Sequence, residues 1–147
     1  MLPLIKFRDQ RCRDEWLSVN IAPLLAQIFL DLAQFSDDIL GHAPTVTCIY
    51  RTFPEDRALN GSGIHCLWRA IDIHADTWTD PTMIAMAKYA NDKWIYDPTR
   101  TSLKTLLWEP HGTGPHGHLQ VSSKTILRPT DPDVQATAAL PKAMQSS

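Results

Sequence analysis

The chain has 147 residues, a length that fits one compact domain. Its apolar fraction of 44% is sufficient to form a buried core. A net charge of -2, without long basic runs, excludes the electrostatic signature of a protein that binds nucleic acid or an anionic membrane.

Cysteine content and apolar segments bear on the compartment. Three cysteines without a CxxC pair argue against a disulfide framework, so we interpret Cys12, Cys48 and Cys66 as reduced thiols. The longest apolar stretch, Ile21–Leu32, is interrupted by a proline and two polar residues and is unsuited to span a bilayer. Met1–Ile5 is too short for the apolar core of a signal peptide. We therefore expect synthesis in the cytoplasm without insertion into a membrane.

Two segments carry the spacing of apolar residues at steps of three and four that is typical of amphipathic helices. The first helix is predicted over about residues 23–40 and ends before Gly41, a natural stop. The second is predicted over about residues 81–94, with Asp80 as its N-cap and Pro81 in its first turn.

Four segments are rich in β-branched residues or alternate between polar and apolar residues, as strands do. They cover residues 45–52, 69–74, 104–108 and 118–122. Segments 53–63 and 110–117 are rich in glycine and proline and are interpreted as loops, and the charged segment 6–15 is interpreted as solvated. The order of helices and strands predicts an α+β fold with a small antiparallel sheet.

The domain organisation that follows is simple. Residues 1–128 are expected to form a single domain. Residues 129–147 show no clear periodicity and are predicted to be an irregular C-terminal tail.

One carboxylate stands out because it lies inside a predicted strand. Asp72 is flanked by two isoleucines, where an unpaired carboxylate is costly to bury. Because side chains alternate along a strand, Asp72 shares a face with His74. The same rule places His116 and His118 on one face of the last strand. If these strands are neighbours, a carboxylate and an imidazole converge.

A third donor enters from the loop before this strand, since His65 precedes Asp72 by seven residues. His65, Asp72 and His118 would fill three positions of a tetrahedral metal site and leave the fourth for water, as in catalytic zinc centres. Each histidine alone is a weak signal, because short histidine patterns arise by chance. The combined pattern carries the prediction.

This combined pattern resembles a known family. Residues 49–73 read IYRTFPEDRALNGSGIHCLWRAIDI, and residues 114–121 read GPHGHLQV. Together they are similar to the zinc peptidases of peptidoglycan, the D-alanyl-D-alanine carboxypeptidase and L-alanyl-D-glutamate endopeptidase group (peptidase M15). The match consists of a Tyr-Arg element, a His-to-Asp spacing and a downstream His-x-His, and it spans roughly residues 23–122.

The resemblance implies a fold and a set of roles. The fold would be that of the D-Ala-D-Ala carboxypeptidase and hedgehog group, with helices packed on one side of the sheet and the zinc site at the sheet. Zn²⁺ would be held by His65, Asp72 and His118. His116 would act as the general base, with Glu109 as the alternative. Arg51 would clamp a substrate carboxylate or the oxyanion.

The sequence departs from the family pattern at three places. The glycine between the histidine and the aspartate is Trp68 here, and the serine before the histidine is Gly63. Pro115 stands where the Glu form of the last motif would have its carboxylate. Trp68 would either crowd the metal or form a wall of the substrate cleft. His74 is either a support for a metal ligand or an ordinary strand histidine.

The function that the resemblance implies is hydrolysis of peptide bonds in peptidoglycan stem peptides, as a D,D-carboxypeptidase or L-Ala-D-Glu endopeptidase. The small size is similar to that of a phage or prophage endolysin, which acts on the cell wall after release. The stem peptide is the expected partner, with neither nucleic acid nor membrane insertion involved. Two alternatives are a zinc-binding module of the same fold that has lost catalysis and a structural virion protein.

Overall fold

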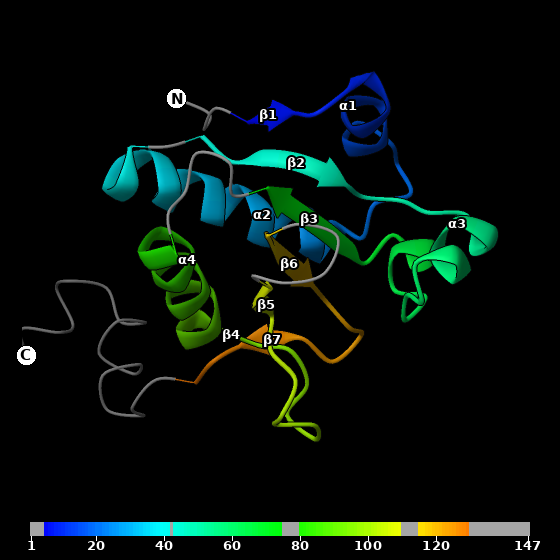
Figure 1. Ribbon diagram of the computed structural model, residues 1–147. Helices are drawn as coiled ribbons and strands as arrows, with labels where there is room; N and C mark the ends of the chain where they lie inside the picture. Colours follow the sequence, from blue (N-terminus) through cyan, green and yellow to red (C-terminus); the bar gives the residue numbers. More distant parts are fainter. Residues whose placement is uncertain (1–4, 42, 75–79, 110–114, 130–147) are drawn as a thin grey trace, which may run out of the picture.

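The computed structural model describes residues 5–41, 43–74, 80–109 and 115–129. Within them the protein is an α+β fold with a five-stranded mixed sheet and four α-helices (Figure 1). The predicted tail at 129–147 lies almost entirely outside the described residues. Among the described residues, no helix has the length and apolar character needed to cross a bilayer.

The main sheet has the strand order β1-β2-β3-β6-β5. Its strands are β1 (Lys6–Phe7), β2 (Thr45–Cys48), β3 (Ala70–His74), β6 (His116–Gln120) and β5 (Leu106–Glu109). Neighbouring strands are antiparallel except for β1 and β2, which are parallel. The expected antiparallel sheet is therefore corrected to a mixed one, because a short strand inside the charged N-terminal segment adds to its edge. A second, two-stranded sheet pairs β4 (Trp94–Ile95) with β7 (Ile126–Leu127).

The structure confirms the two helices that the spacing of apolar residues predicts. Helix α2 covers Pro23–Phe35 and continues as a π-helical turn, η1 (Ser36–Leu40), which ends at Gly41 in the left-handed conformation. Helix α4 covers Asp80–Lys93. Both lie within a residue or two of the predicted bounds.

Two shorter helices were not predicted. Helix α1 (Gln10–Trp16) lies in the segment interpreted as solvated, although it buries Cys12 and Glu15. Helix α3 (Phe53–Ala58) lies in the first predicted loop. It is nucleated by a capping box, in which Thr52 and Glu55 satisfy each other's backbone N–H groups.

The predicted strand 45–52 ends at Cys48 because its continuation bonds to a helix instead of a strand. The backbone N–H of Tyr50 donates to the Glu15 carboxylate, and its carbonyl accepts from Arg11. Both partners belong to α1, so the chain leaves the sheet and enters α3.

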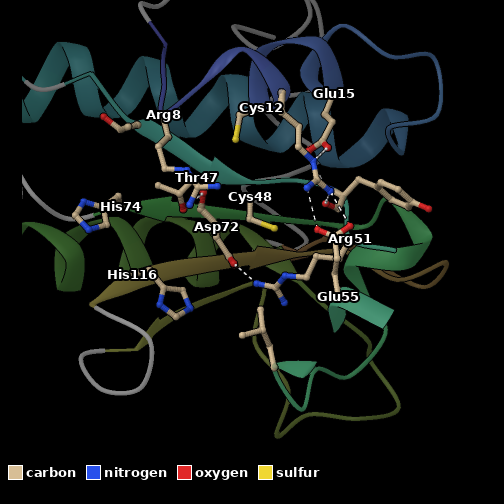
Figure 2. A pocket seen from close by; sticks show the side chains of 14 residues that line it. Arg8, Cys12, Glu15, Thr47, Cys48, Arg51, Glu55, Asp72, His74 and His116 are labelled. Carbon is tan, nitrogen blue, oxygen red and sulfur yellow. Dashed lines mark hydrogen bonds and ion pairs between the residues drawn. The ribbon is translucent and has the colours of Figure 1, made fainter. Parts of the chain in front are cut away.

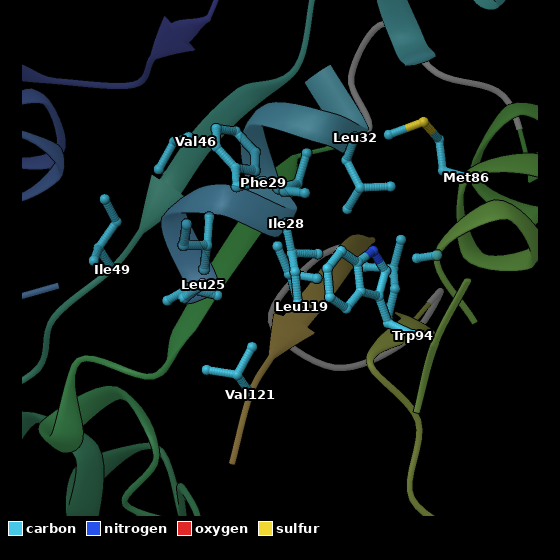
Figure 3. Packing of buried hydrophobic residues seen from close by; sticks show 14 of the residues in the cluster. Leu25, Ile28, Phe29, Leu32, Val46, Ile49, Met86, Trp94, Leu119 and Val121 are labelled. Atoms are coloured by element: carbon cyan, nitrogen blue, oxygen red, sulfur yellow. The ribbon is translucent and has the colours of Figure 1, made fainter. Parts of the chain in front are cut away.

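One face of the sheet forms the hydrophobic core. Alternate residues of the central strands, among them Ile71, Ile73 and Leu119, pack against α2, α4 and Trp94 (Figure 3). Asp72 and His118 lie at the intervening positions and therefore face away from this core. Helices α2 and α4 thus cover one side, and the polar groups gather on the other.

Candidate metal centre

The register of three adjacent strands brings the candidate residues together. Asp72 on β3 pairs directly with His118 on β6, and on its other side with Cys48 on β2. Directly paired residues project to the same face of a sheet. His65 joins them from a short 3-10 turn, η2 (His65–Leu67), just before β3. The structure therefore brings the three residues expected from the sequence to one side of the sheet, but the group whose ligand atoms all lie within 4.8 Å of one another is Cys48, His65 and Asp72, and His118 is not part of it.

The Asp72 carboxylate is the centre of this cluster. Its Oδ1 lies 2.8 Å from Nδ1 of His118 and 3.3 Å from Nε2 of His65. The two imidazole rings meet edge to face with centroids 5.3 Å apart. His65 is only 2% exposed and Asp72 5%. Both imidazoles therefore direct one nitrogen at the same buried oxygen.

The tautomer of His65 follows from the hydrogen bond at Nδ1, the ring nitrogen that does not approach Asp72. Nδ1 lies 3.0 Å from the carbonyl oxygen of Ile49, which can only accept a hydrogen bond. Nδ1 must then carry a proton, and in a neutral ring Nε2 holds a lone pair. Nε2 is buried and makes no hydrogen bond among the described residues, despite its approach to Asp72.

The tautomer of His118 is set in the same way through Gln120. The Gln120 amide nitrogen donates to the Lys104 carbonyl, so its Oε1 is the atom 3.2 Å from Nε2 of His118. Because that oxygen only accepts, Nε2 donates to it and Nδ1 directs a lone pair at Asp72. Ligating histidines in metalloproteins are commonly oriented by such a contact at the other nitrogen.

Three electron-rich atoms thus converge, and their arrangement is favourable only if a cation lies among them. Burial lowers the pKa of His65, but the carboxylate of Asp72 and the thiol of Cys48 raise it by more, to about 10. Burial raises the pKa of Asp72, but His118 and His65 lower it by more, to well below its usual range. The cluster favours positive charge at this point, from protons or from a metal ion, and its donor set suits a metal.

Cys48 is a ligand candidate that the sequence interpretation missed. The ligand atoms of Cys48, His65 and Asp72 all lie within 4.8 Å of one another, so these three residues can hold a metal ion. The Cys48 sulfur is 3.7 Å from Nδ1 of His65. Sequence alone could not place Cys48 here, because a bulge between Val46 and Cys48 shifts the register of β2.

Arg51 lies beside the metal-ligand candidates and also lines the neighbouring cavity. Its guanidinium lies 3.1 Å from Oδ2 of Asp72 and 3.5 Å from Oδ1 of Asp56. Asp56 is itself buried and accepts a hydrogen bond from the backbone N–H of Gly63. Burial lowers the pKa of Arg51, but Cys48, Asp72 and Asp56 together raise it. Arg51 thus orients the Asp72 carboxylate.

A cavity of about 730 Å³ is lined by Asp72, Cys48 and the expected base His116, while His65 and His118 are not among its lining residues. His74 also lines this cavity and pairs directly with His116 across β3 and β6 (Figure 2). This pair lies two residues along the strands from the pair of Asp72 and His118. Glu109, the alternative base, is the partner of His116 on β5 by backbone register. Both candidates therefore lie at the same position along the sheet. Most of the loop predicted at 110–117 lies outside the described residues.

Trp68 adopts the backbone conformation that a glycine would favour. Its φ is 59°, in the left-handed region, where it ends the η2 turn. Its ring stacks on Tyr50, with centroids 4.5 Å apart and planes 10° from parallel. The departure from the family pattern thus falls where the chain turns from His65 into β3.

The chain was compared with family models, with curated proteins and with solved structures, and none of the three comparisons gave a match.

Proposed function

We propose that this protein is a zinc peptidase that hydrolyses peptide bonds in peptidoglycan stem peptides, with the D-Ala-D-Ala carboxypeptidase type of fold. The observation that carries the proposal is the convergence of His65 Nε2, Asp72 Oδ1 and His118 Nδ1, with both imidazole tautomers set by carbonyl oxygens. Two nitrogens and one carboxylate oxygen are a donor set typical of hydrolytic zinc.

The chemistry divides between the metal and the protein. Zn²⁺ bound by His65, Asp72 and His118 would supply Lewis acidity and lower the pKa of a bound water. His116 faces the cavity and is assigned as the group that takes the water's proton and returns it to the leaving amine. Arg51 pairs with the second oxygen of the Asp72 carboxylate, which leaves the first oxygen to the two imidazoles and to a metal ion that they would hold.

The cavity offers room for a short peptide substrate. Its volume is in the range of pockets that bind small molecules and short peptides. Three arginines and three carboxylates line it, and Thr45 and Thr47 add two hydroxyl groups. The side chain of Arg8 is largely exposed and pairs with Asp9. Stem peptides carry the carboxylates that a cavity with this lining can bind. Action on the cell wall after release, as in a phage or prophage lysis protein, completes the proposal.

The test combines zinc content with digestion of purified muropeptides by the wild type, His116→Ala and Glu109→Gln. We expect one zinc per chain in all three proteins and new stem-peptide fragments from the wild type. Removing a general base lowers kcat by about 10²–10⁴-fold. His116→Ala should show this loss while retaining zinc, and Glu109→Gln should remain close to the wild type.

Each other outcome has a definite meaning. The reverse pattern in the two variants assigns the base to Glu109. If the wild type binds zinc but produces no fragments, the binding-module alternative is favoured. Trp68, which stands in place of the glycine of the family pattern, is then the residue to which the loss of catalysis is assigned. Absence of zinc from the purified and zinc-supplemented protein rejects the ligand assignment.

A further inference from the structure

Cys48 lies on the face of the sheet that carries the metal centre, on the strand next to Asp72. It pairs with Asp72 by backbone register, as His118 does from the other side. Asp72 is therefore flanked on both neighbouring strands by a side chain able to bind a metal. Cys48 is half-buried and lines the same cavity as His116 and Arg51 (Figure 2).

The distances place the thiol within reach of a shared ion. Its ligand atom and those of His65 and Asp72 are all within 4.8 Å of one another. Tetrahedral zinc with bonds of about 2.0–2.3 Å brings its ligand atoms to a comparable separation. The buried Nε2 of His65 has no hydrogen-bond partner among the described residues, so an independent feature of the cluster also calls for a ligand.

Charge favours the thiolate as the additional donor. Zn²⁺ with one carboxylate and two neutral imidazoles carries a net charge of about +1, and a thiolate brings the set to neutrality. Burying a neutral set costs less than burying a charged one. The Arg51 guanidinium is offset separately by Asp56.

We propose that Cys48 is the fourth metal ligand, so that the resting centre is a closed set of Cys48, His65, Asp72 and His118. This inference rests on the proposed function for the other three ligands. It adds that the thiolate occupies the position that the hydrolytic water requires. Closed four-ligand sites are typical of tightly held metal, and open sites are typical of catalysis. Cys48 therefore raises metal affinity and restrains hydrolysis until it is displaced.

The test is cobalt substitution, because a thiolate bonded to Co²⁺ produces a charge-transfer absorption in the near ultraviolet that nitrogen and oxygen ligands do not. We expect this band in the wild type after titration with Co²⁺, and its loss in Cys48→Ser. Cys66→Ser is the matched control, since Cys66 adjoins His65 in sequence and should leave the band intact. The apparent zinc affinity should fall about 10-fold or more in Cys48→Ser, and peptide cleavage at saturating zinc should rise.

Besides a failure to bind metal at all, two results overturn the inference. They are Co²⁺ binding to the wild type without the band, and a band that persists in Cys48→Ser. The first is decided on the wild type alone and does not depend on whether the variant folds. Cobalt binding without the band leaves the proposed function standing. A band without peptide cleavage by any variant supports Cys48 and rejects the peptidase, and failure to bind either metal rejects both.

Discussion

At the residue scale, the turn before β3 explains how a tryptophan fits a position where the family pattern has glycine. A left-handed backbone costs a residue with a Cβ roughly 1–2 kcal/mol, and glycine avoids that cost. Trp68 offsets it by stacking on Tyr50, a contact worth about 0.5–1.5 kcal/mol beyond its buried area. Tyr50 belongs to the Tyr-Arg element that also supplies Arg51, so the stack joins two of the three motifs.

The strained backbone at position 68 predicts that glycine is a more stable replacement for Trp68 than alanine, the opposite of the usual order. Trp68→Gly should be more stable than Trp68→Ala by about 1 kcal/mol, because alanine keeps the strain and loses the stack. Both should be less stable than the wild type. The measurement is the free energy of unfolding in urea for the three proteins. An alanine variant equal to or better than the glycine variant would contradict the strain at this turn.

The candidate site was predictable to the extent that it follows from strand alternation. The period of two places Asp72 and His118 on one face, and the spacing to His65 follows from the motif. Cys48 was missed because its position depends on a bulge in β2. Asp56 was missed because the segment that holds it was interpreted as a loop, although the capping box of Thr52 and Glu55 is a local signal for helix α3. The pair of Arg51 with Asp72 likewise required the folded chain, and the expected clamp of Arg51 on a substrate carboxylate stays a prediction.

At the element scale, length decided what the sequence could predict. The long helices α2 and α4 and the strands β3, β5 and β6 were located within about two residues, whereas the predicted strand 45–52 ends at Cys48. Helices α1 and α3 have fewer than two full turns, and β1 has two residues, too few to show any period. These short elements are held by tertiary bonds. Arg11 of α1 binds Glu15 and reaches Glu55 of α3 at 2.9 Å.

The link between α1 and α3 predicts an acid-sensitive contribution to stability. The bond from Arg11, with those from Thr52, lowers the pKa of Glu55 from 4.5 to about 2. Because the folded-state pKa is depressed, the contribution is present above the unfolded pKa and is lost as the pH falls toward about 2. Glu55→Gln should therefore lower Tm at neutral pH, by only a few degrees since the pair is exposed, and the difference should vanish in acid.

The measurement is Tm of the wild type and Glu55→Gln at about pH 7, 4 and 2.5. Asp14→Asn is the control, because Asp14 lies exposed on α1 and bonds only Gln10 among the interactions seen for its side chain. A difference for Glu55→Gln that stays constant with pH would show that the carboxylate charge does not link the two helices.

At the scale of the whole molecule, the sheet separates two tasks. Its apolar face and the helices α2 and α4 form the core, which requires no metal. Its polar face collects donor atoms from η2, β3 and β6, with Cys48 of β2 beside them. β2 and β6 are far in sequence from the η2–β3 segment, and the three are joined at the site by a single buried carboxylate. An ion bound there crosslinks the polar face without contributing to the core.

Metal removal should therefore lower stability without unfolding the protein at room temperature. A ligand that binds only the folded state, at 1,000 times its Kd, stabilises by about 4 kcal/mol, which for a chain of this length raises Tm by roughly 10 °C. Differential scanning calorimetry with excess zinc or with a chelator should show this shift in the wild type. His118→Ala, which keeps the core intact, should lose most of it. If zinc and chelator give the same Tm in the wild type, the converging atoms are held together by protons alone.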